Sequence, residues 1–298
     1  MVLTKMHENE IATDESLVRR LLSTQFPQWA DLPIAAVPSA GTDNALYRLG
    51  DDLVVRLPRI DWAVGQVKKE HQWMPRLAPL LPLAVPTPVE KGRPGEGYPW
   101  EWSIYCWHKG KNATLDQIAD PVQAAVDLAE FLLALQAIDP TGGPDAIEHR
   151  LRGAPLALRD RVTRDAIAAM DGMMDCETAI AVWETALEAS DWDRPAVWFH
   201  GDLLPGNLLF QEGHLHAVID FGGLGVGDPA CDLMIAWGLF AGESREAFRS
   251  VLDVDDATWA RGRGQALSQA AIFIPYYLNT NPVGVDNALH MIDAVLAD

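Results

Sequence analysis

Two short apolar runs in the C-terminal half are separated by a tight turn, and polar residues stand at both ends of the pair. The segments 207–210 (NLLF) and 214–220 (HLHAVID) predict two strands joined by a Gln-Glu-Gly turn. Because a hairpin returns the chain to where it began, Asn207 at its start and Asp220 at its end should lie close together. Asp202, five residues before Asn207, should reach the same edge. The hairpin therefore constrains the fold strongly, since it gathers three polar side chains.

These three side chains suit a phosphoryl-transfer site. Carboxylate and amide oxygens are hard ligands that suit Mg²⁺, which completes its octahedral shell with water and substrate phosphate oxygens. Asp202 can orient an attacking hydroxyl group and accept its proton, while Asn207 and Asp220 can hold Mg²⁺. The alternative is that all three are turn formers and helix caps. Their order and spacing, with a hairpin between them, favour the site.

The N-terminal part of the chain predicts mainly strands. Residues 34–57 have the pattern of a strand meander with polar loops, and residues 62–77 predict a helix with one apolar stripe. The segment 88–99 is rich in Pro and Gly and predicts a connection between strands. The run 100–107 is aromatic and β-branched enough to form a buried strand.

After a short polar linker the pattern changes to helices, which we expect near 121–138, 155–171 and 176–189. We therefore expect an α+β fold with two lobes. A small β-rich N-terminal lobe should span residues 1–107, and a larger, mainly helical C-terminal lobe should span residues 108–298.

Three segments of the second lobe resemble one known family. HGDLLPGN (200–207) and VIDFG (218–222) resemble the catalytic loop and the metal-binding motif of the aminoglycoside phosphotransferase family, and GVGDPACDL (225–233) is also similar. The resemblance extends over nearly the whole chain. It implies a bilobal protein-kinase-like fold, with Mg²⁺ as cofactor and ATP or GTP as the phosphoryl donor. The expected acceptor is a hydroxyl group of a small molecule.

The resemblance also implies a basic residue on the third strand that binds the α/β-phosphates and pairs with a helix Glu. Arg56 in LVVRLP and Glu70, at the border of the apolar stripe, match these positions. Arg59, beyond Pro58, is the alternative base. Two other interpretations stay open, an edge-strand surface Arg and an ordinary surface ion pair for Glu70, because alternation does not show which face of a strand is covered.

Further nucleotide contacts are implied by the positions of two connecting segments. The loop 39–44 (SAGTDN) should cover the triphosphate with backbone N–H groups, including that of Gly41, and with the Thr42 hydroxyl group. At the lobe connection, backbone groups of Cys106 and His108 should read the edge of the base.

One position departs from the family pattern. Protein kinases of the Ser/Thr type carry Lys two residues after the catalytic Asp, and many members of the family carry His there. This chain has Leu204. The departure argues against a protein substrate.

The acceptor should be bound by the second lobe, where FIPYYLNTNP (273–282) is an aromatic and amide-rich break in a helical region. Tyr276, Tyr277 and Asn279 are the candidate contacts, although the segment is equally compatible with a packed helix end. An antibiotic is the expected acceptor. The alternatives are a metabolic acceptor such as an amino alcohol or sugar, and a catalytically silent nucleotide-binding module.

Composition narrows the partners. With 23 Lys and Arg against 42 Asp and Glu, the net charge is −19, which disfavours nucleic acid and anionic membranes and suits a cationic acceptor. Three widely spaced cysteines predict neither a disulfide framework nor a zinc ribbon and suit a reducing cytoplasm. We found no signal-peptide core and no apolar run that could span a bilayer, so we expect a cytoplasmic protein.

Overall fold

The structure is a computed structural model that describes residues 7, 9–38, 41, 43–114, 117–149 and 151–298. The chain divides into two compact units, each of which is described by itself. The first unit contains Met1–Pro79 and Ala84–Lys109, and the second contains Leu80–Leu83 and Gly110–Asp298.

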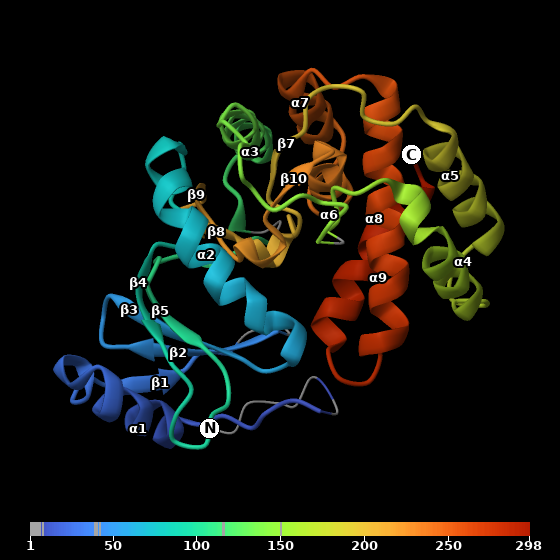
Figure 1. Cartoon of the computed structure of the whole chain (residues 1–298). Coiled ribbons are helices and arrows are strands. Elements are labelled where there is room, and N and C mark those ends of the chain that lie inside the picture. The colour runs from blue at the N-terminus through green and yellow to red at the C-terminus, as the bar shows by residue number, and fades with distance from the viewer. Residues whose placement is uncertain (1–6, 8, 39–40, 42, 115–116, 150) are drawn as a thin grey trace. The chain divides into compact units, whose positions relative to one another are not determined.

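The first unit is built on a sheet with the strand order β1-β2-β3-β5-β4, in which all neighbours are antiparallel. Its strands, labelled in Figure 1, are β1 (Ile34–Ala36), β2 (Asn44–Leu49), β3 (Leu53–Pro58), β4 (Pro88–Gly92) and β5 (Trp102–Cys106). The meander expected over 34–57 and the strand expected within 100–107 are therefore confirmed.

One face of this sheet is covered by α1 (Glu15–Gln25), the dark blue helix beside β1 in Figure 1. The Asp14 side chain caps the helix by accepting a hydrogen bond from the Leu17 N–H at 2.7 Å. The apolar stripe of α1 packs on alternate strand residues, which include Val55 and Leu57 of β3 and Trp102 of β5. This helix was not predicted from the sequence.

The opposite face of the sheet is covered by α2 (Val64–Leu77), the cyan helix beside β4 and β5 in Figure 1. A short 3₁₀ turn, Asp61–Ala63, precedes it, so the α-helix begins two residues later than expected. The strand residues between those that face α1 point toward α2, among them Arg56. The alternation along β3 therefore places Arg56 on the covered α2 face, and it is not a surface residue of an edge strand.

The prediction that 88–99 only connects strands was wrong, because residues Pro88–Gly92 form β4. This strand lies at the edge of the sheet and pairs with β5, with an irregular register near Pro88. Its pattern is mostly exposed and it begins with Pro, which an edge strand tolerates because one side of its backbone needs no partner strand.

The second unit is mainly helical, as predicted. The long helix α8 (Asp256–Tyr277) packs against α9, α5 and α4, and Figure 1 shows it beside α9. The other α-helices are α3 (Pro121–Gln136), α4 (Asp160–Ala169), α5 (Cys176–Glu188), α6 (Ile235–Gly238), α7 (Glu243–Leu252) and α9 (Pro282–Leu296). Within the described part of the chain, no helix is both long enough and apolar enough to cross a membrane.

Two small sheets carry the segments singled out from the sequence. The hairpin of β8 (Leu208–Gln211) and β9 (His214–Val218) is confirmed, and β8 also pairs with β6 (Lys111–Asn112). A second, two-stranded sheet joins β7 (Val197–Phe199) to β10 (Gly225–Gly227). The motif segments therefore lie directly after β7, at the start of β8 and after β9.

Gly92 and Gly65 give opposite tests of packing in the first unit. A Cβ added at Gly92 would lie 2.0 Å from Cε2 of Trp102, whose side chain is fully buried, whereas nothing lies within 4 Å of a Cβ at Gly65 on α2. We expect Gly92→Ala to lower the free energy of unfolding by about 1–3 kcal/mol because the core is overpacked.

Gly65→Ala is the matched control and should leave stability unchanged or slightly raised. Urea unfolding followed by tryptophan fluorescence measures both variants. Equal stability of the two would contradict the packing of Gly92 against Trp102.

Candidate active site

The carboxylate of Asp202 is held by Asn207, five residues later. Asn207 Nδ2 donates to the backbone oxygen of Asp202 at 2.7 Å and to its Oδ2 at 3.2 Å. Both side chains are partly buried, and a 3₁₀ turn, Pro205–Asn207, carries the chain between them. Because the amide nitrogen faces Asp202, the amide oxygen is the atom of Asn207 that can act as a metal ligand.

The hairpin brings Asp220 beside Asn207. The backbone oxygen of Asn207 accepts a hydrogen bond from the Ile219 N–H at 2.8 Å, and Leu208 pairs with Val218 in the ladder. Asp220 follows immediately with φ 64° and ψ 67°, a left-handed conformation that Asp adopts more readily than most residues. This conformation turns the chain directly after the strand.

A buried carboxylate organises the backbone around Asp202. Asp232, in the 3₁₀ helix Pro229–Met234, is fully buried and accepts hydrogen bonds from the N–H groups of His200 and Gly201, each at 2.7 Å. Burial raises the pKa of Asp232, while His200 and the two N–H donors act in the opposite direction. The buried Asp232 carboxylate thus fixes the backbone of the loop that carries Asp202.

His200 connects the loop to the hairpin. Its Nδ1 accepts a hydrogen bond from the Asp202 N–H at 3.1 Å, and its Nε2 lies 3.0 Å from the backbone oxygen of Ile219. The pair of contacts assigns the proton to Nε2, and the ring packs edge-on against Phe221 with 4.5 Å between ring centroids. His200 therefore positions the loop through hydrogen bonds.

The loop approaches the segment after β9 so closely that side chains do not fit. Gly201 has φ +80°, and a Cβ there would lie 2.4 Å from the backbone oxygen of Gly223. The backbone carrying Asp202 can therefore lie directly against the backbone that follows Asp220.

Gly201→Ala should uncouple this arrangement. The left-handed conformation costs a non-glycine residue about 1–2 kcal/mol, and the clash with Gly223 adds to that cost. We expect phosphoryl transfer to fall by about 100-fold or more, because misplacement of a catalytic group by about 1 Å has effects of that size.

Gly206→Ala is a matched control in the same loop, since nothing lies within 4 Å of its added Cβ. It should fold normally and keep most of the activity. Kinetic assays with thermal unfolding of both variants test this, and comparable losses in the two would argue against the close approach at Gly201.

The side-chain oxygens at the ends of the hairpin fit a Mg²⁺ ion whose remaining coordination positions are filled by the substrate. Within the described ranges, no group of three or more His, Cys, Asp or Glu side chains could hold a metal by itself. Asn207 and Asp220 together offer an amide oxygen and a carboxylate, which are hard donors. A pair of such ligands is typical of Mg²⁺ sites that rely on phosphate oxygens and water for the remaining positions.

In the first unit, Arg56 and Glu70 form a buried ion pair. Arg56 Nη1 lies 2.7 Å from Oε1 and 2.9 Å from Oε2 of Glu70, which is 0% exposed. The Tyr105 hydroxyl group also donates to Glu70, and burial together with the Glu70 charge raises the Tyr105 pKa well above its usual value. The Arg56–Glu70 contact predicted from the sequence is thus present.

Two amides continue this cluster. Arg56 Nη2 donates a hydrogen bond to Oε1 of Gln66 at 3.1 Å. When the Asn44 side chain is oriented with its amide oxygen toward Arg56, that oxygen accepts a hydrogen bond from Arg56 Nε at 3.1 Å. The alternative base, Arg59, instead lies 3.8 Å from Oε2 of Glu10. Arg56, and not Arg59, is therefore the basic residue that Glu70 of α2 holds in place.

The remaining nucleotide predictions fall on less informative positions. Gly41 is exposed in the segment between β1 and β2, and Thr42 lies outside the described residues. The Cys106 N–H donates to the backbone oxygen of Thr87 at 3.1 Å, so it takes part in the sheet. The His108 ring lies 2.9 Å from the Val85 backbone oxygen. Base recognition by backbone groups of Cys106 and His108 stays a prediction.

The break expected within 273–282 was wrong over its first half, because α8 continues through Pro275 to Tyr277. Tyr277 is buried against Phe273, with 4.3 Å between ring centroids, so it packs at the end of the helix, and its role as an acceptor contact stays a prediction. Tyr276 and Asn279 are exposed, and their role as acceptor contacts stays a prediction.

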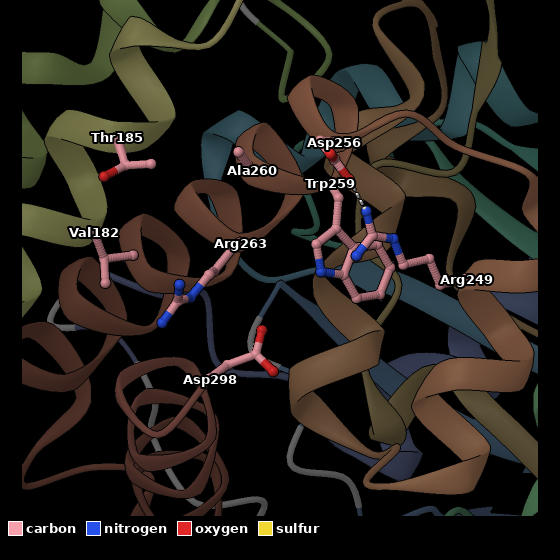
Figure 2. A pocket seen from close by; sticks show the side chains of 8 residues that line it. All are labelled: Val182, Thr185, Arg249, Asp256, Trp259, Ala260, Arg263 and Asp298. Carbon is pink, nitrogen blue, oxygen red and sulfur yellow. Dashed lines mark hydrogen bonds and ion pairs between the residues drawn. The ribbon is translucent and has the colours of Figure 1, made fainter.

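Figure 2 shows a pocket of about 140 Å³ in the second unit whose lining residues do not include Asp202, Asn207 or Asp220. Two of its charged groups are paired with each other, since Arg249 contacts Asp256, and Arg249 also lies 4.9 Å from the Trp259 ring centroid. This pocket therefore contains none of the residues that the sequence assigns to phosphoryl transfer.

Sequence analysis missed one residue at Asp202. Arg152, between α3 and α4, forms an ion pair with Oδ1 of Asp202 and also donates to the backbone oxygen of Gly201. It comes from a segment without regular secondary structure 50 residues earlier. No local pattern marks such a contact.

Comparison with known proteins gives a consistent result. A sequence model of the phosphotransferase enzyme family matches residues 35–267, while a search of curated proteins found no match. The GDP complex of wild-type aminoglycoside 2′-phosphotransferase-IIIa is 18% identical with a TM-score of 0.73, covering 96% of this chain and 99% of that one.

Two macrolide enzymes are also similar in structure. Macrolide 2′-phosphotransferase type I is 19% identical with a TM-score of 0.64, covering 97% of each chain. The macrolide 2′-phosphotransferase from Brachybacterium faecium is 23% identical with a TM-score of 0.60, covering 93% of this chain and 97% of that one. The α+β protein-kinase-like fold predicted from the sequence is confirmed.

Proposed function

We propose that this chain, which belongs to the phosphotransferase enzyme family, moves the γ-phosphate of ATP or GTP to a hydroxyl group of a small molecule. The observation that carries the proposal is the double contact of Asn207 with Asp202, made where the hairpin brings Asp220 alongside. A base and two oxygen ligands on one short stretch of chain are the parts that phosphoryl transfer requires.

Asp202 is assigned the role of base. The acceptor hydroxyl group donates its hydrogen bond to the Asp202 carboxylate, which takes the proton as the acceptor oxygen bonds to the γ-phosphorus. The bond between that phosphorus and the β,γ-bridging oxygen breaks, and the nucleoside diphosphate leaves. Asn207 holds the carboxylate through Oδ2, so the base is oriented before the acceptor binds.

Asn207 Oδ1 and the Asp220 carboxylate are assigned to Mg²⁺. When bound, this ion would neutralise charge on the phosphate oxygens. Arg56, fixed by Glu70, is assigned to the α/β-phosphates, where its permanent charge and forked donors suit phosphate oxygens.

An antibiotic is the acceptor class that we favour. The support is the likeness to solved enzymes whose names specify aminoglycosides or macrolides as acceptors. Phosphorylation would add negative charge and bulk where a drug must fit its target.

The test is a mass-spectrometric screen for the gain of one phosphoryl group. The purified chain, Mg²⁺ and either ATP or GTP are incubated with aminoglycosides, macrolides, amino alcohols and sugars. We expect a product from a hydroxylated antibiotic. The Asp202→Asn variant should lose about 10²- to 10⁴-fold in rate, the usual contribution of a general base.

The screen also separates the other candidate functions. A product formed from an amino alcohol or sugar alone would replace the antibiotic proposal with a metabolic one. Nucleotide binding without any product would contradict the transferase proposal and favour a silent binding module. Equal activity of Asp202→Asn and wild type would remove Asp202 from the mechanism.

Asp220→Asn tests the metal assignment separately from catalysis. Asn also tolerates left-handed backbone, so the variant should fold, but it removes one negative charge from the cation site. At a nucleotide concentration about 100 times the Kd, binding stabilises a protein by about 2.7 kcal/mol.

We expect the wild type to show such a stabilisation with Mg²⁺ and nucleotide together, and Asp220→Asn to lose most of it. Thermal unfolding with and without Mg²⁺ provides the measurement. An undiminished Mg²⁺-dependent shift in the variant would show that Asp220 does not hold the ion.

A further inference from the structure

Arg152 reaches the catalytic loop from a segment that is itself anchored. The next residue, Gly153, packs so tightly that an added Cβ would lie 2.2 Å from the Phe199 ring, at the end of β7. The backbone oxygen of Gly153 also accepts a hydrogen bond from the Asp228 N–H at 2.9 Å. Arg152 therefore starts from a fixed point close to the strand that leads into Asp202.

The guanidinium of Arg152 is held on two sides. Nη1 donates to the backbone oxygen of Gly201 and to Oδ1 of Asp202, each at 2.5 Å. On the other side, Nε donates to Oε1 of Gln269 on α8 at 3.0 Å. Exposed ion pairs usually contribute little. This one is partly buried, with the two side chains 27% and 26% exposed, and three acceptors fix the geometry of the cation.

The Asp202 carboxylate is thus oriented by two donors of different kinds. Arg152 contacts Oδ1 and Asn207 contacts Oδ2. A carboxylate offers about four lone-pair sites, so each oxygen can still accept a further hydrogen bond from an acceptor hydroxyl group. The two donors fix the side-chain torsion of the base without using up its capacity to accept.

This contact bears on the departure at position 204. Protein kinases of the Ser/Thr type place a Lys two residues after the catalytic Asp, where this chain has Leu204. Leu204 cannot supply a charge to the loop. Arg152 supplies a permanent positive charge at Asp202 from a different segment of the same unit.

We infer that Arg152 is a positioning residue of the transfer site, which orients Asp202 and provides the cation that position 204 lacks. The inference rests on the proposed phosphotransferase function. It predicts that Arg152 acts on the rate of transfer and not on nucleotide affinity, because its contacts are to the base and to the loop backbone.

The experiment compares Arg152→Ala and Arg152→Lys with wild type, using the acceptor identified by the mass-spectrometric screen. Arg152→Ala should lower kcat by about 10²- to 10³-fold, the effect of removing one preorganised electrostatic donor, with little change in the KM for nucleotide. Arg152→Lys should keep an intermediate rate, because an ammonium group carries the charge but lacks a second nitrogen that can donate to Gln269 while the first donates to Gly201 and Asp202.

Chemical rescue separates positioning from a purely structural role. Added guanidinium or methylguanidinium ion should restore part of the kcat of Arg152→Ala and should not restore Asp202→Asn. Arg164→Ala is the matched control, since Arg164 pairs with Asp160 and Glu184 on exposed surface. It should keep the wild-type rate, and thermal unfolding of all variants checks that they fold.

Side-chain ¹⁵N NMR tests the contact independently of turnover. The Arg152 guanidinium should show restricted rotation in the wild type, and Asp202→Ala should release it. A normal kcat in folded Arg152→Ala, or an equal loss in Arg164→Ala, would overturn the positioning role. A freely rotating guanidinium in wild type would also overturn it.

The failure of the proposed function would have a different signature. Restricted Arg152 rotation combined with an absence of transfer by wild type would contradict the phosphotransferase proposal itself, and the catalytic role of Arg152 with it.

Discussion

The buried carboxylate of Asp232 is the constraint from which the geometry of the site follows. Its two oxygens accept hydrogen bonds from the backbone N–H groups of His200 and Gly201. Two consecutive peptide groups are therefore fixed in position just before the chain reaches Asp202. Burial alone would favour the neutral acid, and the two N–H donors stabilise the charged form against that penalty. The loop is therefore rigid at its root, where a glycine permits contact with the neighbouring backbone.

The side chains around this loop are then oriented by specific hydrogen bonds and ion pairs. His200 ties the loop to the hairpin, Asn207 orients Asp202, and Arg152 holds the second oxygen of the same carboxylate. In the first unit, Glu70 fixes Arg56 by the same means, with Tyr105 as an additional donor. In both units a charged group that we propose to act on substrate is held by a buried or half-buried partner, which would lower the cost of ordering it during the reaction.

Several elements of the fold could be predicted from local sequence patterns. The hairpin was predicted because the alternation of short strands around a turn is a local signal. The Arg56–Glu70 pairing was predicted from the resemblance to the phosphotransferase family, which supplied what strand alternation could not. Helix α1 was missed although Asp14 before an apolar stripe is a helix-start signal. Strand β4 was hidden by its Pro and Gly residues and by its exposed edge position.

Contacts that depend on tertiary structure were beyond sequence reasoning. Arg152 lies in a segment without regular structure, and its partner is 50 residues away, so neither periodicity nor spacing identifies it. The face of β3 that carries Arg56 became clear once α1 and α2 were seen on opposite sides of the sheet. Helix α8 likewise continues through Pro275 to Tyr277, and it packs on α9, a tertiary contact that the sequence does not show.

The most direct test of the central claim is a crystal structure of the chain with Mg²⁺ and the β,γ-imido analogue of ATP or GTP. The account predicts that Asn207 Oδ1 and the Asp220 carboxylate bind the Mg²⁺. It also predicts that Asn207 Nδ2 still donates its hydrogen bonds to Asp202. A nucleotide-bound Mg²⁺ that contacts neither Asn207 nor Asp220 would contradict it.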